Sequence, residues 1–378
     1  VLIRPEELGL TVEFLSPCLL IPKQDGGWRL VTDFTMLNKS ISRDTSSSPT
    51  IADAKVDLTK KKYRCELDLS NYFFQHGLRR EDASYLGIQH PTRGVFVYTA
   101  SPQGLLNSSE GAYNLLGRIY GDMMEKGQLT RLADSVYPLG DTWEELTINY
   151  SETLRRAEIC NLTFKPSKTI LGPKTSVIFG WVLDDGEWKP QEHVISSLVR
   201  AETPKTCKQL RSFLGAYKQI NMCIPEYALL LTPFEKVLAS RSSAERIEWT
   251  DELKKSFDKL KAAAADPRGV HVPKKTDKLI TSSDYSKTHS AIGGVLTIIR
   301  EGEDGEETRL HGGHYSAMLD KNQSKWLTCE AEALAVKKVL NHFEPEIRNS
   351  QHQTLHLTDN IPTMLAWKRM LLGKFSSN

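Results

Sequence analysis

The sequence contains no CxxC pair and no long apolar run. Its six cysteines, Cys18, Cys65, Cys160, Cys207, Cys223 and Cys329, are scattered along 378 residues. This spacing argues against a zinc site and a disulfide framework, and it is typical of a reducing compartment. No apolar stretch approaches the roughly 20 residues of a membrane-spanning helix, and no signal peptide opens the chain. We therefore expect an intracellular protein without a membrane partner.

An excess of charge of one sign is also missing. The 49 basic and 47 acidic residues leave a formal net charge of +2, so any grip on nucleic acid must come from local basic patches. The length allows two or three domains, each with its own core. The chain starts at Val1 and stops at Asn378 after a basic, helix-like stretch. We expect a fragment of a longer polypeptide.

Residues 62–76 contain the acid around which the rest of the chain can be arranged. The segment YRCELD alternates apolar and polar side chains, which predicts a strand with one apolar and one polar face. Asp68 ends this strand, where a carboxylate could hold a metal ion, and the aromatic residues Tyr72, Phe73 and Phe74 follow. A half-exposed edge strand with a solvated acid is the alternative for this segment alone.

A second acid, Asp134, lies between two short predicted strands. Aspartate is common at such a hairpin apex for reasons of turn geometry alone. If Asp68 and Asp134 met across a sheet, their carboxylates would repel unless a cation joined them. Two Mg²⁺ ions about 3.5–4 Å apart can hold the attacking and leaving oxygens of a phosphoryl transfer.

The neighbouring segments predict a hairpin and several helices. The hairpin joins residues 18–22 to 28–33 through a turn at 24–27, and it presents the basic residues Lys23 and Arg29. Such residues are most often solubilising, but they would also suit a polyphosphate.

Two of the predicted helices carry a capping signal. Asn107 with Glu110 and Thr142 with Glu145 have the spacing of capping boxes. A further short helix is predicted at residues 51–58, before the strand that ends in Asp68.

From about residue 270 the pattern changes to strands, a helix and a strand. Asp284 ends one predicted strand, Glu332 lies on a helix predicted at 326–343, and Asp359 ends a later strand. Each acid alone would be an ordinary surface residue. The helix is expected to bury one face, made of Cys329, Ala333, Val336, Leu340 and Phe343.

Several segments together resemble one family. LDLSNYFFQ, SPQGLLNS and LADS resemble, in order and interval, the three palm motifs of reverse transcriptases from LTR retrotransposons and retroviruses. WRLVTDFTMLNKS is similar to their fingers motif, and KPSK followed by IFGWVL to the end of the palm and the primer grip. LRSFLGAYKQINMCIPEYALLLTPFEKVL and IEWTDELKKSFDKLK resemble the thumb and connection of gypsy-type elements, and the three later acids resemble those of the retroelement RNase H domain.

The resemblance implies an α+β polymerase right hand of fingers, palm and thumb, followed by an α/β RNase H-like domain that is C-terminally incomplete. Fingers and palm would occupy residues 1–186, a mainly helical thumb and connection 187–268, and the RNase H-like domain 269–378. The implied activity is RNA-directed DNA polymerisation, with RNA of RNA–DNA hybrids as the substrate of the tethered domain. The parent Pol polyprotein would also carry protease and integrase.

The resemblance also implies roles for individual residues. Mg²⁺, with Mn²⁺ as an alternative, would be bound by Asp68, the Leu69 carbonyl and Asp134, and in the RNase H-like domain by Asp284, Glu332 and Asp359. The residues implied to contact the incoming nucleotide are Lys23, Arg29, Phe73, Gln103 and Lys168, with Phe73 excluding a ribose 2′-hydroxyl. The residues implied to support the primer end are Phe179, Gly180 and Trp181.

The implied partners are an RNA template, a DNA primer, an RNA–DNA hybrid and dNTPs, and the resemblance is compatible with a dimer. A cytoplasmic retroelement particle with a nuclear phase is the expected location. The sequence departs from the family at the hairpin, where Leu132-Ala133-Asp134-Ser135 replaces the usual Tyr-x-Asp-Asp. We place Asp134 at the essential aspartate and Ser135 at the second, although a register with Ala133 in the essential place is the alternative.

A second departure concerns the RNase H-like acids. No Asp or Glu follows Asp359, so the family's fourth acid has no counterpart and RNA cleavage by this fragment is expected to be weak or absent. The alternative to a polymerase is a catalytically degenerate or domesticated copy that acts as a nucleic-acid-binding or protein scaffold.

Overall fold

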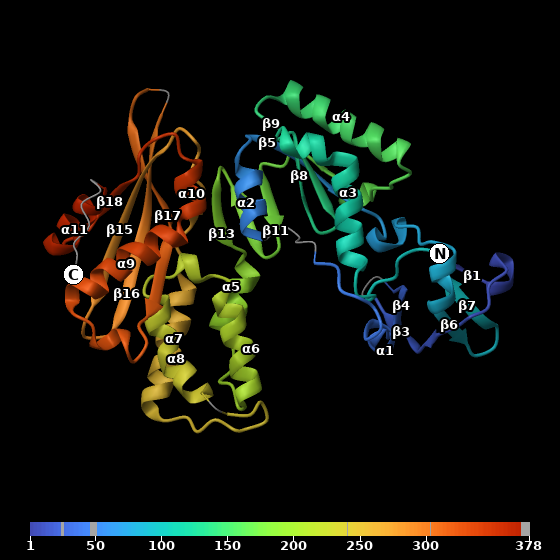
Figure 1. Cartoon of the computed structure of the whole chain (residues 1–378), viewed down its shortest axis with the longest axis horizontal. Helices are drawn as coiled ribbons and strands as arrows, with labels where there is room; N and C mark the ends of the chain where they lie inside the picture. Colours follow the sequence, from blue (N-terminus) through green and yellow to red (C-terminus); the bar gives the residue numbers. More distant parts are fainter. Residues whose placement is uncertain (24–25, 46–50, 240, 303, 372–378) are drawn as a thin grey trace. The chain divides into compact units, whose positions relative to one another are not determined.

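The computed structural model describes residues 1–23, 26–45, 51–239, 241–302 and 304–371 (Figure 1). The chain divides into two compact units, Val1–Pro173 and Lys174–Asn378. The predicted turn residues Gln24 and Asp25 lie outside the described residues. Among the described residues, no helix is both long and apolar enough to cross a membrane.

The first unit begins with a four-stranded sheet and a separate hairpin. The sheet has the order β1 (Leu2–Ile3), β7 (Gly94–Tyr98), β6 (Gly87–His90) and β2 (Leu15–Ser16). The hairpin pairs β3 (Cys18–Pro22) with β4 (Trp28–Thr32), as the sequence predicts. The short helix α1 (Thr35–Asn38) follows. Phe34, Leu37, Leu86, Ile88 and Tyr98 form the core of this part.

A second sheet in the same unit carries Asp68. Its order is β10 (Ile170–Leu171), β5 (Tyr63–Asp68), β9 (Ser135–Gly140) and β8 (Leu129–Leu132). The accompanying helices are α2 (Ile51–Thr59), α3 (Ser108–Glu125) and α4 (Trp143–Ile159). The core between sheet and helices includes Leu67, Leu116, Tyr120, Met123, Val136 and Ala157. The alternating pattern of the sequence therefore predicts β5 correctly, and the two short strands expected around Asp134 are confirmed as the β8–β9 hairpin.

Two local expectations in this unit are wrong. Asn107 precedes α3, but its side chain does not cap the helix and instead bonds the 42–44 loop, accepting from Asp44 N–H and donating to the Ser42 carbonyl. Arg64 on the polar face of β5 is buried, at 6% exposure, and on the same face of the sheet α2 packs against β8. There Asp57 of α2 accepts a hydrogen bond from Thr130. Thr142, by contrast, caps α4 as expected, accepting from Glu145 N–H.

The second unit opens with a sheet and a group of helices. The sheet consists of β11 (Thr175–Ile178), β12 (Trp181–Asp184), β13 (Glu187–Pro190) and β14 (Val270–His271). The helices are α5 (Glu192–Val199), α6 (Cys207–Lys218), α7 (Tyr227–Leu238) and α8 (Asp251–Ala265). Thr206 and Gln209 form a reciprocal capping box at the start of α6.

The last part of the chain forms a four-stranded sheet with helices. The strand order is β17 (Glu307–Met318), β16 (Ala291–Glu301), β15 (Lys278–Ser286) and β18 (Leu355–Leu357), and only β18 pairs in parallel. Helix α9 (Thr328–His342) packs on this sheet and is followed by α10 (Glu344–Asn349) and α11 (Ile361–Leu371) (Figure 1). A Cβ on Gly294 would collide with the Val339 side chain, so glycine at this position lets α9 approach the sheet closely.

The buried face of α9 differs from the expected one. Its buried residues are Ala331, Glu332, Ala335, Val336 and Val339. Of the predicted set, Val336 and Phe343 are buried, whereas Cys329, Ala333 and Leu340 are only partly so. The buried face differs from the predicted one because it includes the acid Glu332, which a prediction from apolar periodicity does not assign to a buried face.

Three histidines are partly buried where β14 approaches β17. The rings of His311 and His314 have their centroids 4.3 Å apart, and His271 lies on β14. Burial lowers the pKa of each imidazole; that of His314 falls to about 4, with His311 and Arg268 adding to the effect. All three rings are therefore neutral at pH 7.

We predict that acid destabilises this unit through His314. The unfolded chain binds a proton near the ordinary His pKa of 6.5, whereas folded His314 does so only near 4. His314 therefore does not affect the free energy of unfolding above pH 6.5, and it lowers this free energy as the pH falls from 6.5 towards 4. Thermal unfolding followed from pH 7 to about pH 5 should show a smaller loss of Tm in His314→Gln than in the wild type. The exposed His352→Gln serves as the control, and an equal pH profile for both variants would contradict this account.

Candidate functional site

Asp68 and Asp134 are brought together by the pairing of β5 with β9. Asp68 is directly opposite Ser135 in this antiparallel register, and Leu67 is opposite Val136. The N–H of Leu69 donates to the backbone carbonyl of Asp134 at 2.8 Å. The two acids thus lie at adjacent strand ends, and Ser135 occupies the position facing Asp68.

The hairpin apex has an unusual backbone. Ala133 has φ of 52°, in the left-handed region that non-glycine residues seldom adopt. Next to it, Ser135 hydrogen-bonds to Tyr137, whose pKa burial raises to about 12. Sequence patterns do not single out Tyr137, and only the strand register, which puts it on the same face as Ser135, could have suggested it.

A lysine already faces the first acid. Lys168 is the last residue of the short helix η4 (Pro166–Lys168), and its Nζ lies 2.8 Å from Asp68 Oδ2. The Asp68 side chain is 18% exposed. The N–H of Lys165 donates to the Asp68 carbonyl at 2.8 Å, which fixes the start of this turn. The hydrogen bond to Asp68 raises the pKa of Lys168, and the charge of Asp134 adds to it. The field of the two carboxylates therefore favours a cation at this point, and their oxygens are the ligand type that Mg²⁺ prefers.

The other residues predicted to contact nucleotide lie in exposed or half-buried positions of the first unit. Lys23 and Arg29 are exposed on the β3–β4 hairpin. Phe73 lies in η2 (Tyr72–Gln75), five residues after Asp68, with its ring centroid 5.1 Å from that of Tyr72. Gln103 is exposed in the loop before α3.

The predicted primer-grip residues belong to the second unit. Phe179 and Gly180 form the turn between β11 and β12, with φ of 48° and 79°. Phe179 is 56% exposed, whereas Trp181 begins β12 and is 6% exposed. The Phe179 ring in this turn is thus exposed to solvent, whereas Trp181 at the start of β12 is buried.

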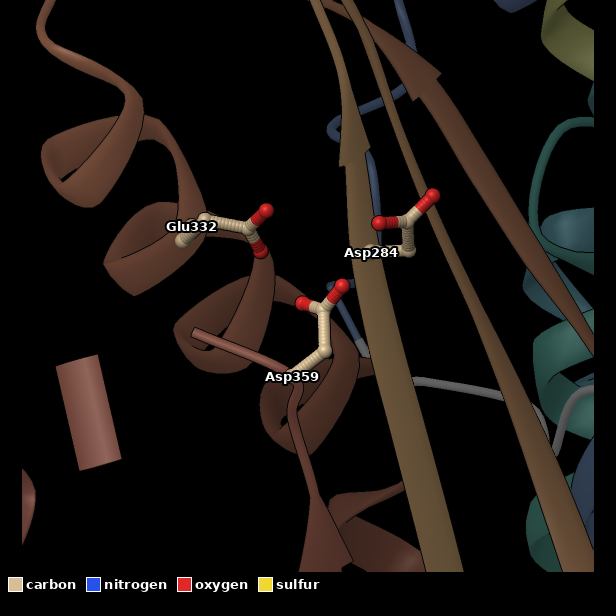
Figure 2. A group of neighbouring side chains, drawn as sticks. All are labelled: Asp284, Glu332 and Asp359. Atoms are coloured by element: carbon tan, nitrogen blue, oxygen red, sulfur yellow. The ribbon is translucent and has the colours of Figure 1, made fainter. Parts of the chain in front are cut away.

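A group of three acids lies in the second unit. One carboxylate oxygen each from Asp284, Glu332 and Asp359 lies within 4.8 Å of the others, and Figure 2 shows the side chains converging. Asp284 comes from β15, Glu332 from α9 and Asp359 from the segment after β18. The sequence predicts that Asp359 ends a strand, but β18 ends at Leu357, so the acids that meet at this point come from a strand, a helix and the segment after a second strand.

The charges in this acid cluster are unbalanced. Glu332 is 4% exposed, and its pKa is raised to about 7 by burial first and then by Asp284 and Asp359. Its Oε2 is buried without a hydrogen-bond partner among the described residues. A divalent cation would relieve this repulsion, so the donor set fits such an ion.

Two family models match the chain. "Reverse transcriptase (RNA-dependent DNA polymerase)" matches residues 21–183, and "RNase H-like domain found in reverse transcriptase" matches residues 249–355. The first range includes Asp68 and Asp134, and the second includes Asp284 and Glu332. The chain therefore contains a reverse transcriptase domain followed by an RNase H-like domain of the kind found in these enzymes.

Over nearly its whole length the chain is similar to a region of transposon polyproteins. It is 23% identical over 361 residues to the Transposon Tf2-3 polyprotein of Schizosaccharomyces pombe (strain 972 / ATCC 24843), and the Tf2-4 polyprotein of the same organism matches equally. The match covers 96% of this chain and 26% of each polyprotein, so the chain spans about a quarter of their length.

Solved structures confirm the fold. The foamy viral protease-reverse transcriptase dRH in complex with double-stranded DNA has a TM-score of 0.82 at 17% identity, covering 97% of this chain and 61% of that one. The foamy viral protease-reverse transcriptase with an RNA/DNA hybrid has a TM-score of 0.73 at 17% identity, covering 100% of this chain and 48% of that one. The expected polymerase hand followed by an RNase H-like domain is therefore correct.

We predict that Glu332→Gln stabilises the metal-free protein near neutral pH. The folded carboxyl group has a pKa near 7, above its ordinary 4.5, so the folded state holds its proton between these values and loses stability as the pH rises through this window. The Tm of the variant should exceed that of the wild type at pH 7.5 and differ little at pH 4.5. Mg²⁺ should raise the Tm of the wild type more than that of the variant. Equal responses would show that Glu332 takes no part in cation binding.

Proposed function

We propose that this chain is an RNA-directed DNA polymerase of an LTR retrotransposon that acts by two-metal nucleotidyl transfer at Asp68 and Asp134. The observation that carries the proposal is the pairing of β5 with β9, which puts both acids at one sheet end inside the region matched by the reverse transcriptase model. The Lys168–Asp68 contact supports it, because it marks this end as a site for positive charge.

The chain's own residues have distinct tasks in this reaction. Divalent cations held by Asp68, Asp134 and the Leu69 carbonyl would activate the primer 3′-hydroxyl and neutralise charge at the reacting phosphate. Lys23 and Arg29 bind the triphosphate, for which a lysine and a bidentate arginine are suited. Phe73 fills the space beside the sugar and so excludes a 2′-hydroxyl. Lys168 would lose its contact with Asp68 on cation binding, and its amino group would then be free to approach the nucleotide.

We propose that the RNase H-like domain takes the RNA of RNA–DNA hybrids as its substrate at the acid cluster, with the weak or absent cleavage expected of a cluster of three acids. Asp284, Glu332 and Asp359 together would hold divalent cations for hydrolysis. The bound DNA and RNA/DNA hybrid of the foamy viral structures support template, primer and hybrid as partners of this chain. Recognition would rest on the backbone and shape of the duplex, since a copying enzyme cannot prefer a sequence.

A second candidate function is a nucleic-acid-binding scaffold without chemistry. Ser135 favours it, because the hydroxyl opposite Asp68 brings no charge to the metal site. The two candidates differ in one measurable property, the Mg²⁺- or Mn²⁺-dependent extension of a DNA primer on an RNA template.

We predict that Asp68→Asn lowers the rate of primer extension by about 10³-fold or more, because the substitution removes a metal-binding charge while keeping the side-chain shape. Incorporation of dNTPs on an RNA template, with Mg²⁺ and with Mn²⁺, measures the effect. Asp82→Asn, at an exposed aspartate of the same unit, is the matched control and should extend primers normally. A wild type that is inactive with both metals would favour the scaffold.

Ser135→Asp is predicted to increase activity. The substitution places a carboxylate opposite Asp68 and adds a metal ligand, so the Mn²⁺ concentration needed for half-maximal extension should fall. Ser135→Asn has the same size without the charge and should not reproduce the effect. If both variants behave alike, charge at position 135 does not limit the reaction.

A further inference from the structure

Asp359 lies two residues after β18, the least supported of the elements that position the acid cluster. β18 has only three residues, and within the described part of the chain it pairs on one side alone, with β15. Its Leu355 and Leu357 are 56% and 49% exposed, so apolar burial contributes little to holding it. By comparison, β15 has nine residues and α9 has 15. Short edge strands of this kind open easily.

His356, at the centre of β18, is bound to the strand that carries Asp284. Its Nδ1 lies 2.8 Å from Thr281 Oγ1 and its Nε2 lies 3.0 Å from Ser283 Oγ. Thr281 is fully buried and Ser283 is 7% exposed. A neutral imidazole has one donor and one acceptor, and a hydroxyl can meet either, so both ring nitrogens are satisfied. Burial lowers the pKa of His356, which keeps the ring neutral at pH 7.

Thr363 anchors the other side of Asp359. Its hydroxyl donates to the carbonyl of Cys329 at 3.1 Å, and its N–H donates to Asn360 Oδ1 at 2.9 Å. Thr363 is 2% exposed, and Cys329 lies at the start of α9, the helix that carries Glu332. The segment around Asp359 is therefore tied both to the strand of Asp284 and to the helix of Glu332.

These anchors act against the mutual repulsion of the cluster. The nearby charges of Asp284 and Asp359 help to raise the pKa of Glu332, which shows that the three carboxylates interact unfavourably. An acid that closely follows a three-residue edge strand can move away most easily. Metal ligands must be held to within about 0.5 Å of their productive geometry, so such movement would weaken cation binding.

We propose that His356 is a positioning residue of this cation site, fixing Asp359 relative to Asp284 through Thr281 and Ser283, with Thr363 as the second anchor. The proposal rests on the cation-binding function proposed above for the acid cluster. It concerns the affinity of the site for the ion and assigns His356 no contact with the ion itself.

The test is Mn²⁺ binding by the whole chain, measured by electron paramagnetic resonance of the free ion. All proteins carry Asp68→Asn, so that the palm site does not contribute. In this background His356→Ala and Thr281→Val are each expected to weaken binding to the cluster about tenfold or more. Thr281→Val keeps the shape of the side chain and removes only the hydroxyl. His352→Ala, at an exposed histidine of the same domain, should leave binding unchanged.

Amide hydrogen exchange separates positioning from general unfolding. In the variants, the amides of β18 should exchange faster while those of β16 and α9 keep their protection. If His356→Ala does not fold, Ser283→Ala is a milder variant, because it removes only one of the two hydrogen bonds of the His356 ring. Binding that is absent in the Asp68→Asn background, or insensitive to Glu332→Gln, would refute the cation site itself. Binding that depends on Glu332 but survives both His356→Ala and Thr281→Val would refute only the role of His356.

Discussion

Repulsion between carboxylates held close together is the constraint on which both candidate sites depend. In water such groups would separate, so the fold must hold them by bonds that do not involve the acids' own charges. In the first unit this is done by the backbone, since the register of β5 with β9 and the Leu69–Asp134 hydrogen bond set the distance. In the second unit it is done by side chains, because three different elements have to be brought to one point.

The two sites also differ in how their charge is balanced. Asp68 has a cation of the chain itself, Lys168, within hydrogen-bond distance. Glu332 has no such partner among the described residues, and its raised pKa is the consequence. Because the pKa of Glu332 is raised to about 7, binding of a cation at the acid cluster would release the proton that Glu332 holds near neutral pH.

Much of this arrangement could be predicted from local sequence patterns. The alternation in YRCELD predicts β5, and a turn between short apolar runs predicts the hairpin with Asp134 at its apex. What could not be predicted depends on contacts between distant segments. Arg64 is buried although it lies on the polar face of β5, and Asn107 bonds the 42–44 loop and not its own helix. The buried face of α9 could not be predicted for the same reason, because Glu332 is buried where its carboxylate lies close to Asp284 and Asp359.

His356 illustrates a further limit. In the sequence it is one polar residue inside a short apolar run, LHL, and its partners lie more than 70 positions away along the chain. The hydrogen bonds of His356 to Thr281 and Ser283 form only when β18 pairs in parallel with β15. Residues of this kind are recognised from a structure, because the strand pairing on which their contacts depend is not local in the sequence.

The close contact between α9 and the sheet at Gly294 has a consequence for how this domain can change over generations. Any side chain at that position would press against Val339 and the Ser282 carbonyl and would lift the helix away from the strands. Because Glu332 is carried by the same helix, the displacement would reach the acid cluster from two turns away. A copy of the element that acquired alanine there could keep every catalytic residue and still lose the geometry they need.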